Sequence, residues 1–167
     1  MTAIIIVMGV VGAGKTTIGS LLAQRLGWEF LEGDMFHPPA NIEKMSHGIP
    51  LTDADRIPWL EAIRDAIRER IADLQSAVVA SSALKQSYRD ILKVGPEVTF
   101  VYLKAGPNLI AERLHSRHGH FATEQLLPSQ FATLEEPDDA IVVDAAPQPE
   151  EIVREIQRRL RLPSPRA

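Results

Sequence analysis

Residues 9–16 read Gly9-Val10-Val11-Gly12-Ala13-Gly14-Lys15-Thr16 and match the pattern G-x-x-x-x-G-K-[ST]. The apolar, β-branched stretch Ala3–Met8 precedes them and predicts a buried strand that leads into a glycine-rich turn. A helix is expected to begin at Lys15. A strand, a glycine-rich turn and a helix in this order are the setting in which the pattern forms a phosphate-binding loop.

The residue types of the loop explain how it would hold phosphate. Glycines let successive backbone N–H groups turn around an anion, and the helix N-terminus adds partial positive charge. Lys15 would reach the β- and γ-phosphates, and the hydroxyl of Thr16 would hold Mg²⁺. The expected ATP contacts come from Gly9, Gly12, Ala13, Gly14, Lys15, Thr16 and Thr17. The alternative is a purely structural glycine turn. A dinucleotide fingerprint is excluded, because position 17 is Thr where that motif needs Gly or Ala.

Length and composition limit the remaining classes of protein. With 167 residues, 45% of them hydrophobic, the chain can form one domain with a substantial core. A net charge of −4 disfavours a partner made of nucleic acid. The absence of cysteine excludes disulfides and fits a cytoplasmic location. The apolar N-terminus lacks a basic flank and runs directly into the loop, so we interpret it as a strand rather than a signal peptide, and no membrane partner is expected.

The chain alternates strand and helix patterns, which predicts an α/β fold, a five-stranded parallel sheet flanked by helices, in a single domain over 1–162. Residues 163–167 are expected to be a flexible tail. The expected strands are Ala3–Met8, Glu29–Glu32, Ala77–Ala80, Val98–Leu103 and Ala140–Val143. The expected helices begin near Lys15, Pro58, Gln86, Pro107 and Pro149, three of them at a proline because the first turn needs no N–H there. The last helix should pack on the sheet through Ile152, Val153, Ile156 and Leu160.

Two stretches interrupt the alternation, Asp34–Trp59 and His115–Glu136. Insertions that follow strands lie at the carboxyl edge of a parallel sheet, where ligands bind. We therefore expect these stretches to determine the choice of substrate.

Several classes of phosphate-loop protein can be tested against the sequence. A GTPase switch is disfavoured because neither Asn-Lys-x-Asp nor Asp-x-x-Gly occurs. A mechanical ATPase needs a strand that ends in Asp for its metal, whereas the third strand is followed by Ser81-Ser82. A small kinase remains, which needs an aligned acceptor, a metal and cations around the transferred group.

Asp34 and Arg56 are the candidates for binding the acceptor. The carboxylate of Asp34, at the end of the second strand, can accept a proton from an acceptor hydroxyl or orient it, and can hold Mg²⁺ through water. A turn or N-cap aspartate is the alternative. Arg56 can clamp a carboxylate through two parallel hydrogen bonds. Its alternative is a local salt bridge to Asp53 or Asp55.

Lys85 and Arg89 are four residues apart, so on a helix they would share one face. Two cations just after the third strand suit an anionic substrate or its transferred phosphate. The alternative is a solvated helix face on which they pair with Asp90 or Glu97. Tyr88, between them, is expected to pack rather than react.

Longer segments carry a resemblance to a known family. The chain resembles the gluconokinase family of small carbohydrate kinases over nearly its whole length. The segments that carry this resemblance are Gly33-Asp34 with His37-Pro38, Asn41–Met45, Gly48–Leu60, Ser82–Asp90, Gly119–Phe121 and Leu126–Glu135. The Asp-Arg-x-Pro-Trp-Leu and Ala-Leu-Lys-x-x-Tyr-Arg-Asp pieces are distinctive together.

The resemblance implies ATP-dependent, Mg²⁺-assisted phosphorylation of D-gluconate on its 6-hydroxyl, giving 6-phospho-D-gluconate and ADP. It implies a P-loop kinase fold similar to shikimate and nucleoside monophosphate kinases, with a substrate-binding insertion over 34–72, a lid over 115–136 and a homodimer. By analogy, Asp34 orients the hydroxyl and Arg56 grips the substrate carboxylate. The alternatives are a kinase of the same fold for another small anionic polyol such as shikimate, a nucleoside monophosphate kinase, and a catalytically silent nucleotide-binding regulator.

The segment Glu112–Phe121 is similar to the lid of these kinases. The resemblance implies that Arg113 lies along the adenine, that Arg117 swings onto the phosphates as a catalytic residue, and that His120 touches substrate. A solvated basic helix end is the alternative. His118 and His120 are not expected to bind a metal, because no acid or cysteine stands at ligand spacing. The loop after the last strand would contact the adenine through its backbone.

Overall fold

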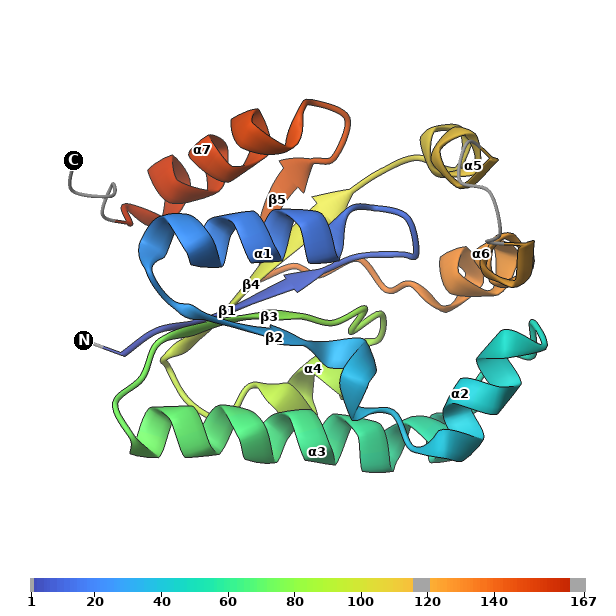
Figure 1. Cartoon of the computed structure of the whole chain (residues 1–167), viewed down its shortest axis with the longest axis horizontal. Coiled ribbons are helices and arrows are strands. Elements are labelled where there is room, and N and C mark those ends of the chain that lie inside the picture. The colour runs from blue at the N-terminus through green and yellow to red at the C-terminus, as the bar shows by residue number, and fades with distance from the viewer. Residues whose placement is uncertain (1, 116–120, 163–167) are drawn as a thin grey trace.

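The computed structural model describes residues 2–115 and 121–162 and consists of a central parallel sheet between two layers of helices (Figure 1). The elements in chain order are β1 (Ile4–Met8), α1 (Lys15–Leu26), β2 (Glu29–Glu32), the 3₁₀ helix η1 (Gly33–Phe36), α2 (Pro39–Ser46), α3 (Asp53–Ala72), β3 (Ala77–Ala80), α4 (Gln86–Leu92), β4 (Val98–Lys104), α5 (Pro107–His115), α6 (Phe121–Thr133), β5 (Ile141–Asp144) and α7 (Pro149–Leu160). The sheet has the order β2-β3-β1-β4-β5, and every pair is parallel. The predicted five-stranded parallel sheet is confirmed.

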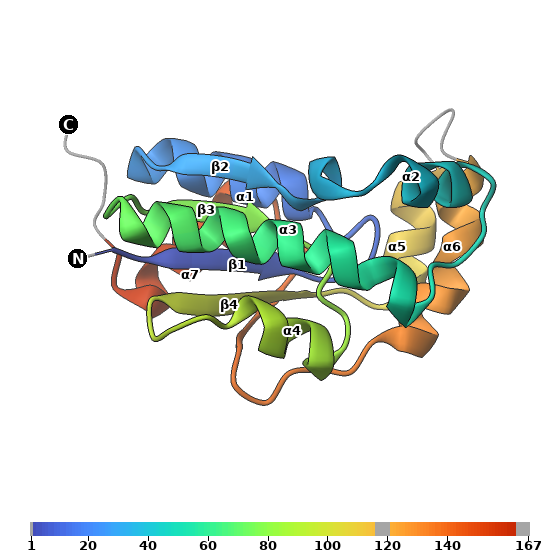
Figure 2. The same ribbon diagram turned by 90° about the horizontal axis from the view of Figure 1, so that it is seen from below.

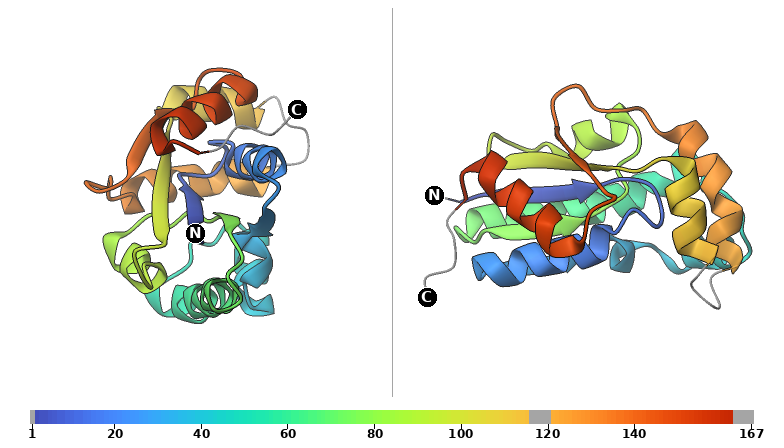
Figure 3. Two further views of the ribbon diagram at one scale, coloured as in Figure 1. Left: turned by 90° about the vertical axis from the view of Figure 1, so that its left-hand side faces the viewer. Right: turned by 90° about the horizontal axis from the view of Figure 1, so that it is seen from above.

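The two faces of β1 serve different halves of the core. Ile5 and Val7 pack with the helices α1 and α7, which cover one face of the sheet (Figure 3). Ile4, Ile6 and Met8 pack with α3 and α4 on the other face (Figure 2). A strand buried on both sides has no polar face, which explains the uninterrupted apolar run at the start of the sequence.

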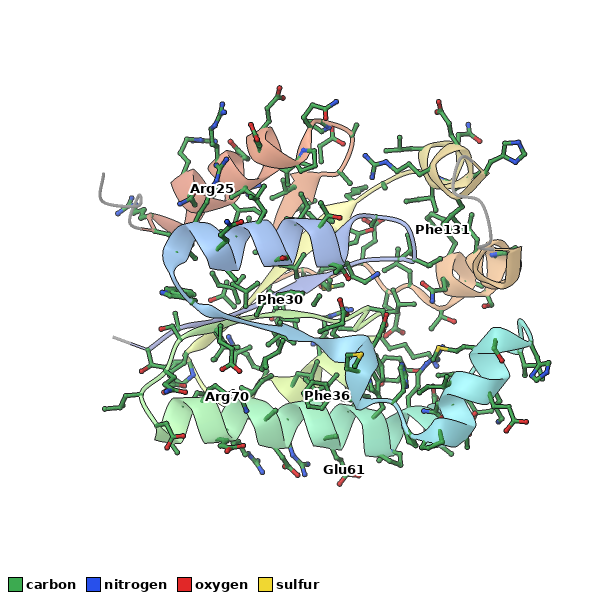
Figure 4. The ribbon with its side chains drawn as sticks, viewed as in Figure 1. Arg25, Phe30, Phe36, Glu61, Arg70 and Phe131 are labelled. Carbon is green, nitrogen blue, oxygen red and sulfur yellow. The ribbon has the colours of Figure 1, made fainter. Side chains whose placement is uncertain are left out.

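Helix α7 covers its face of the sheet through the apolar stripe expected from the sequence. Ile152, Val153 and Ile156 are buried, and Leu160 packs against the same cluster. On the opposite face, Figure 4 shows Glu61 on the outer side of α3 and Arg70 on the side toward the sheet. There Arg70 pairs with Glu29 of β2 at 3.0 Å.

Helix α3 begins at Asp53, so the predicted start at Pro58 is wrong. The hydroxyl of Thr52 accepts a hydrogen bond from the amide of Asp55 (3.1 Å), and the carboxylate of Asp55 accepts one from the amide of Thr52 (2.9 Å). This capping box satisfies the first amides of the helix and moves its start upstream of the proline. Pro58 lies inside the helix as a result.

The insertions after β2 and β4 gather at the carboxyl end of the sheet. Figure 1 shows α2, α5 and α6 beside one another there, at the end opposite to the N-terminus. Helices α2 and α6 were absent from the predicted elements. In the described residues, no helix is long and apolar enough to cross a membrane.

Gly33 fixes the connection from β2 into η1. A Cβ atom at Gly33 would lie 2.2 Å from the backbone carbonyl oxygen of Ala80 in β3. The carbonyl of Gly33 also accepts a hydrogen bond from the indole Nε1 of Trp59 (2.8 Å), which joins η1 to α3. A backbone atom cannot move aside as a flexible side chain can, so only glycine fits here.

We therefore expect Gly33→Ala to lower the free energy of unfolding by about 1–3 kcal/mol, because it forces β2 away from β3. Urea unfolding would measure the loss. Gly106→Ala is the matched control, since a Cβ atom at Gly106 meets no atom within 4 Å. Equal unfolding free energies for the two variants would contradict the steric explanation.

Candidate active site

The glycine-rich loop passes from β1 into α1 with glycines in the left-handed region. Gly12 and Gly14 have φ angles of 81° and 101°, which glycine adopts without strain. The amide of Ile18 donates to the carbonyl of Gly14 (2.8 Å). The amides that precede Ile18 in the first turn of α1 therefore have no acceptor within the helix. These donors and the positive end of the helix dipole make the loop suitable for an anion.

The amine of Lys15 lies within electrostatic reach of Glu32, the last residue of β2, and of Asp34. The Lys15 Nζ donates to the carbonyl of Val10 (2.9 Å). Burial lowers the pKa of the Lys15 amine, while the charges of Asp34 and Glu32 act to raise it. A cation in this position can take up a phosphate group brought to the loop.

Glu32 is a candidate site residue that the sequence reasoning missed. Its carboxylate accepts hydrogen bonds from the hydroxyl of Thr16 and from the amide of Asp34, the latter at 3.4 Å. Its place at the end of β2, two residues before Asp34, is the signal that could have identified it.

Oxygen atoms suited to Mg²⁺ occur together at this point. They belong to Thr16, Glu32 and Asp34, and hard oxygen ligands are those that Mg²⁺ prefers. Among residues 2–115 and 121–162, no group of three or more His, Cys, Asp or Glu side chains could hold a metal. A magnesium ion would therefore complete its coordination with water and phosphate oxygens.

A first cavity, of about 420 Å³, lies between the phosphate loop and the loop that follows β5. Arg113 connects these two loops. Its guanidinium donates to the carbonyl of Ala13 (3.3 Å) and to that of Ala145. The lining residues are Gly12, Ala13, Gly14, Thr17, Ile18, Arg113, Ala145, Ala146, Pro147, Gln148, Pro149 and Ile152. The structure thus brings Arg113, Thr17 and the loop after β5 together around one space.

A second cavity, of about 370 Å³, is bordered by Lys15 and lies toward the first insertion. It brings together Lys15, Asp34 and Arg56, three of the site residues expected from the sequence. The complete lining is Val11, Lys15, Asp34, His37, Ile42, Met45, Ser46, Pro50, Leu51, Arg56, Trp59, Ser82, Ser129 and Gln130. A carboxylate and two cations around a space of this size suit a small anionic molecule with a hydroxyl group.

The guanidinium of Arg56 is positioned by a neutral side chain. Its Nη1 donates to the hydroxyl of Tyr88 (2.8 Å), and the guanidinium lies 5.4 Å from the centre of the Tyr88 ring. The Tyr88 hydroxyl donates in turn to Asp53. Within the described residues, the ion pair of Asp53 is with Lys85 and that of Asp55 is with Lys44, and neither aspartate forms an ion pair with Arg56.

Lys85 and Arg89 do not share a helix face. Helix α4 begins at Gln86, so Lys85 is its N-cap and extends to Asp53 at 3.0 Å. Arg89 is only 2% exposed and donates to the carbonyls of Ala83 (2.7 Å) and Glu135 (2.8 Å). Burial lowers the pKa of Arg89. Neither residue lines the second cavity, and Arg89 holds the segment after α6 against α4.

Two further groups on the cavity wall were not singled out from the sequence. His37 is buried and stacks on Trp59, with ring centres 4.3 Å apart. Gln130 of α6 accepts a hydrogen bond from the amide of Val11 (2.7 Å) and so joins the second insertion to the phosphate loop. Both lie in segments that carry the family resemblance, but their roles depend on contacts between distant parts of the chain. The predicted site residues Arg117 and His120 lie outside the described residues, as does His118.

The chain is similar to known kinases over most of its length. A family model described as shikimate kinase matches residues 11–161. The gluconokinase of Gluconobacter oxydans is 49% identical over 159 residues, which are 92% of this chain and 89% of that protein.

Two solved structures are also similar to this chain over most of its length. A sugar kinase from Janibacter is 43% identical with a TM-score of 0.90, over 97% of this chain and 96% of that one. A gluconokinase from Sinorhizobium meliloti is 48% identical with a TM-score of 0.81, over 92% of this chain and 88% of that one. Taken with the phosphate loop and its two adjoining cavities, this likeness shows that the chain belongs to the gluconokinase family of P-loop kinases.

Proposed function

We propose that this protein transfers the γ-phosphoryl group of ATP to the 6-hydroxyl of D-gluconate, giving 6-phospho-D-gluconate and ADP. The observation that carries the proposal is the second cavity, where a carboxylate beside Lys15 and the guanidinium of Arg56 border one small space. Gluconate has the matching chemistry, since it bears a primary hydroxyl at one end and a carboxylate at the other. The gluconokinase names of close relatives support this choice of acceptor.

The phosphates of ATP would bind the amides of the phosphate loop from Gly9 to Thr17, and Lys15 would contact the β- and γ-phosphates. The adenine would occupy the first cavity, beside Arg113 and the loop after β5. Thr16 would hold Mg²⁺, with Asp34 and Glu32 acting through water. When bound, the ion neutralises charge on the phosphate oxygens.

In the transfer step, the oxygen of the 6-hydroxyl forms a bond to the γ-phosphorus while the bond from that phosphorus to the bridging β-oxygen breaks. Asp34 accepts the hydrogen bond of the hydroxyl, orients its oxygen and takes up the proton that this oxygen loses as the new bond forms. Lys15 offsets the charge that moves onto the leaving oxygen. Arg117 of the lid would add positive charge when the lid closes and would help to exclude water.

Arg56 would bind the carboxylate of gluconate through two parallel hydrogen bonds. Its hydrogen bond to Tyr88 and its position against the Tyr88 ring would hold the guanidinium ready for the ligand. We also retain Lys85, Arg89 and His120 as proposed substrate contacts from the resemblance, of which Arg89 has the least support because its guanidinium is turned inward. The cytoplasmic location and the homodimer stay predictions.

A coupled ADP-release assay with Mg-ATP tests the proposal against gluconate, shikimate, glycerate, glucose and the nucleoside monophosphates. We expect saturable turnover with gluconate and background rates with the others. Lys15→Ala should abolish the turnover, because it removes the cation nearest the β- and γ-phosphates. Turnover with a different acceptor would overturn the assignment of gluconate. A normal rate in Lys15→Ala would overturn the role of the loop.

Asp34→Asn should lower kcat by roughly 10²–10⁴-fold with little change in KM for ATP, because the amide cannot accept the proton or orient the hydroxyl as a carboxylate does. Steady-state kinetics at saturating ATP would measure the change. Met35→Leu is a suitable control, since Met35 is exposed and does not line the cavity. An Asp34→Asn variant with unchanged kcat would exclude the carboxylate from the reaction.

Arg56→Lys should raise KM for gluconate by about tenfold or more and leave KM for ATP unchanged, because a point charge cannot form two parallel hydrogen bonds. Tyr88→Phe should raise the same KM by a smaller factor, since the charge remains but its acceptor is lost. The two variants are compared by kinetics with each substrate varied in turn. If KM for ATP changed instead, Arg56 would belong to the nucleotide site.

A further inference from the structure

His37 forms part of the wall of the second cavity, which we call the acceptor cavity from here on, and none of the roles described so far involves it. It follows η1 directly, and its amide donates to the carbonyl of Asp34 (3.3 Å). The side chain is 8% exposed, and its ring lies against the indole of Trp59 at an interplanar angle of 12°. The position of the ring is therefore fixed from the backbone and from one face.

The contacts of Asn41 determine which ring nitrogen of His37 carries the proton. The amide Nδ2 of Asn41 donates to the backbone carbonyl of Asp55 (2.8 Å). Because a carbonyl oxygen can only accept, the atom in that position must be the amide nitrogen and not the amide oxygen. The same nitrogen lies 3.2 Å from Nδ1 of His37 and has a second hydrogen to donate. Nδ1 therefore accepts, and in the neutral ring the proton is on Nε2.

The Nε2–H group of His37 has no partner among the residues that the structure describes. The fully buried side-chain polar atoms without a partner there are Ser81 Oγ and Arg89 Nε. His37 Nε2 is therefore not sealed from open space, and His37 is among the residues that line the acceptor cavity. The other aromatic donor on the wall, Nε1 of Trp59, is already bound to Gly33. The Nε2–H group is thus an oriented donor without a partner among the described residues, on a side chain that lines the cavity.

The surroundings of the ring favour its neutral form. Burial lowers the pKa of His37, with the charge of Asp34 raising it and that of Arg56 lowering it. The neutral ring is thus favoured, and the ring lies within electrostatic reach of both Asp34 and Arg56. Asp34, Arg56 and His37 line the same cavity, so a ligand that contacts Asp34 and Arg56 shares this space with His37.

We propose that His37 is a specificity-determining residue whose Nε2–H donates a hydrogen bond to a hydroxyl oxygen of the acceptor's polyol chain. The inference rests on the proposed function, because it takes the ligand of this cavity to be a linear polyhydroxy acid. A site with a buried donor for a hydroxyl discriminates against an analogue that lacks this group, since the donor is then left unpaired. His37 would therefore favour polyhydroxy acids over deoxygenated ones of the same length.

The pair His37→Gln and His37→Asn tests the donor directly. Both variants lose the imidazole that stacks on Trp59, so they share that defect. The amide nitrogen of Gln can reach the position of Nε2, whereas that of Asn reaches only the position of Nδ1. We expect His37→Asn to lower kcat/KM for gluconate roughly 10–100-fold, mainly through KM, and His37→Gln to restore most of the loss. KM for ATP should not change in either variant, and equal kinetic constants in the two would overturn the proposal.

A second measurement needs no active variant. Long-range ¹H–¹⁵N correlation spectra of the wild-type protein distinguish a protonated from an unprotonated ring nitrogen, and the His37 signals are identified by their loss in His37→Gln. We expect Nδ1 unprotonated and Nε2 protonated. The opposite tautomer would overturn the proposal. The wild-type assay keeps the two hypotheses apart: absence of gluconate turnover refutes the proposed function, whereas turnover without a difference between the two variants refutes only the role of His37.

Discussion

The hydrogen bond from the indole of Trp59 to the carbonyl of Gly33 holds the acceptor side of the molecule in place. It joins Trp59 of α3 to Gly33, the first residue of η1, and these two residues lie at opposite ends of the first insertion. Asp34 follows Gly33, Arg56 precedes Trp59 by one turn, and His37 stacks on the same indole. The close approach of Gly33 to Ala80 fixes the other end of this connection against the sheet. One buried aromatic residue thus sets the relative positions of three groups on the cavity wall.

The two aspartates near Arg56 form ion pairs with lysines and not with Arg56, among the residues that the structure describes. Asp53 is engaged by Lys85 and Tyr88, and Asp55 by Lys44, whose hydrogen bond holds the pKa of the Asp55 carboxyl at about 2. The capping box gives Asp55 a second task in the fold, as a cap of α3. Among the described residues, the two aspartates therefore form their ion pairs with lysines, and Arg56 donates its hydrogen bond to the phenol of Tyr88. This arrangement leaves the guanidinium able to attract an anionic ligand from solution.

The features that were predictable from the sequence are those that local chemistry determines. The phosphate loop, the five strands and the apolar stripe of α7 each follow from residue type and spacing over a few positions. The predicted start of α3 was wrong because two local signals for a helix start compete there. Pro58 favours a start at the proline, whereas the capping box favours a start upstream, and the observed helix follows the capping box. The prediction that Lys85 and Arg89 share a helix face was wrong because α4 begins at Gln86, one residue after Lys85. Lys85 extends to Asp53, whereas Arg89 is directed inward to the carbonyls of Ala83 and Glu135. Glu32, His37 and Gln130 each have at least one partner far away along the chain, which their local sequence does not reveal: Thr16 for Glu32, Trp59 for His37 and Val11 for Gln130.

Gln130 shows how one such long-range contact joins the second insertion to the phosphate loop. Its side-chain oxygen accepts a hydrogen bond from the amide of Val11 in the phosphate loop, and Gln130 also lines the acceptor cavity. The segment that follows α6 is held by Arg89 and by the amide of Gln86, which donates to Glu135 at 2.8 Å. The C-terminal part of α6 is therefore attached to the core at the same time as it touches the loop. The second insertion is therefore attached to the core and to the phosphate loop at its C-terminal end, while α5, which precedes it, is attached to the phosphate loop and to the loop after β5 through Arg113.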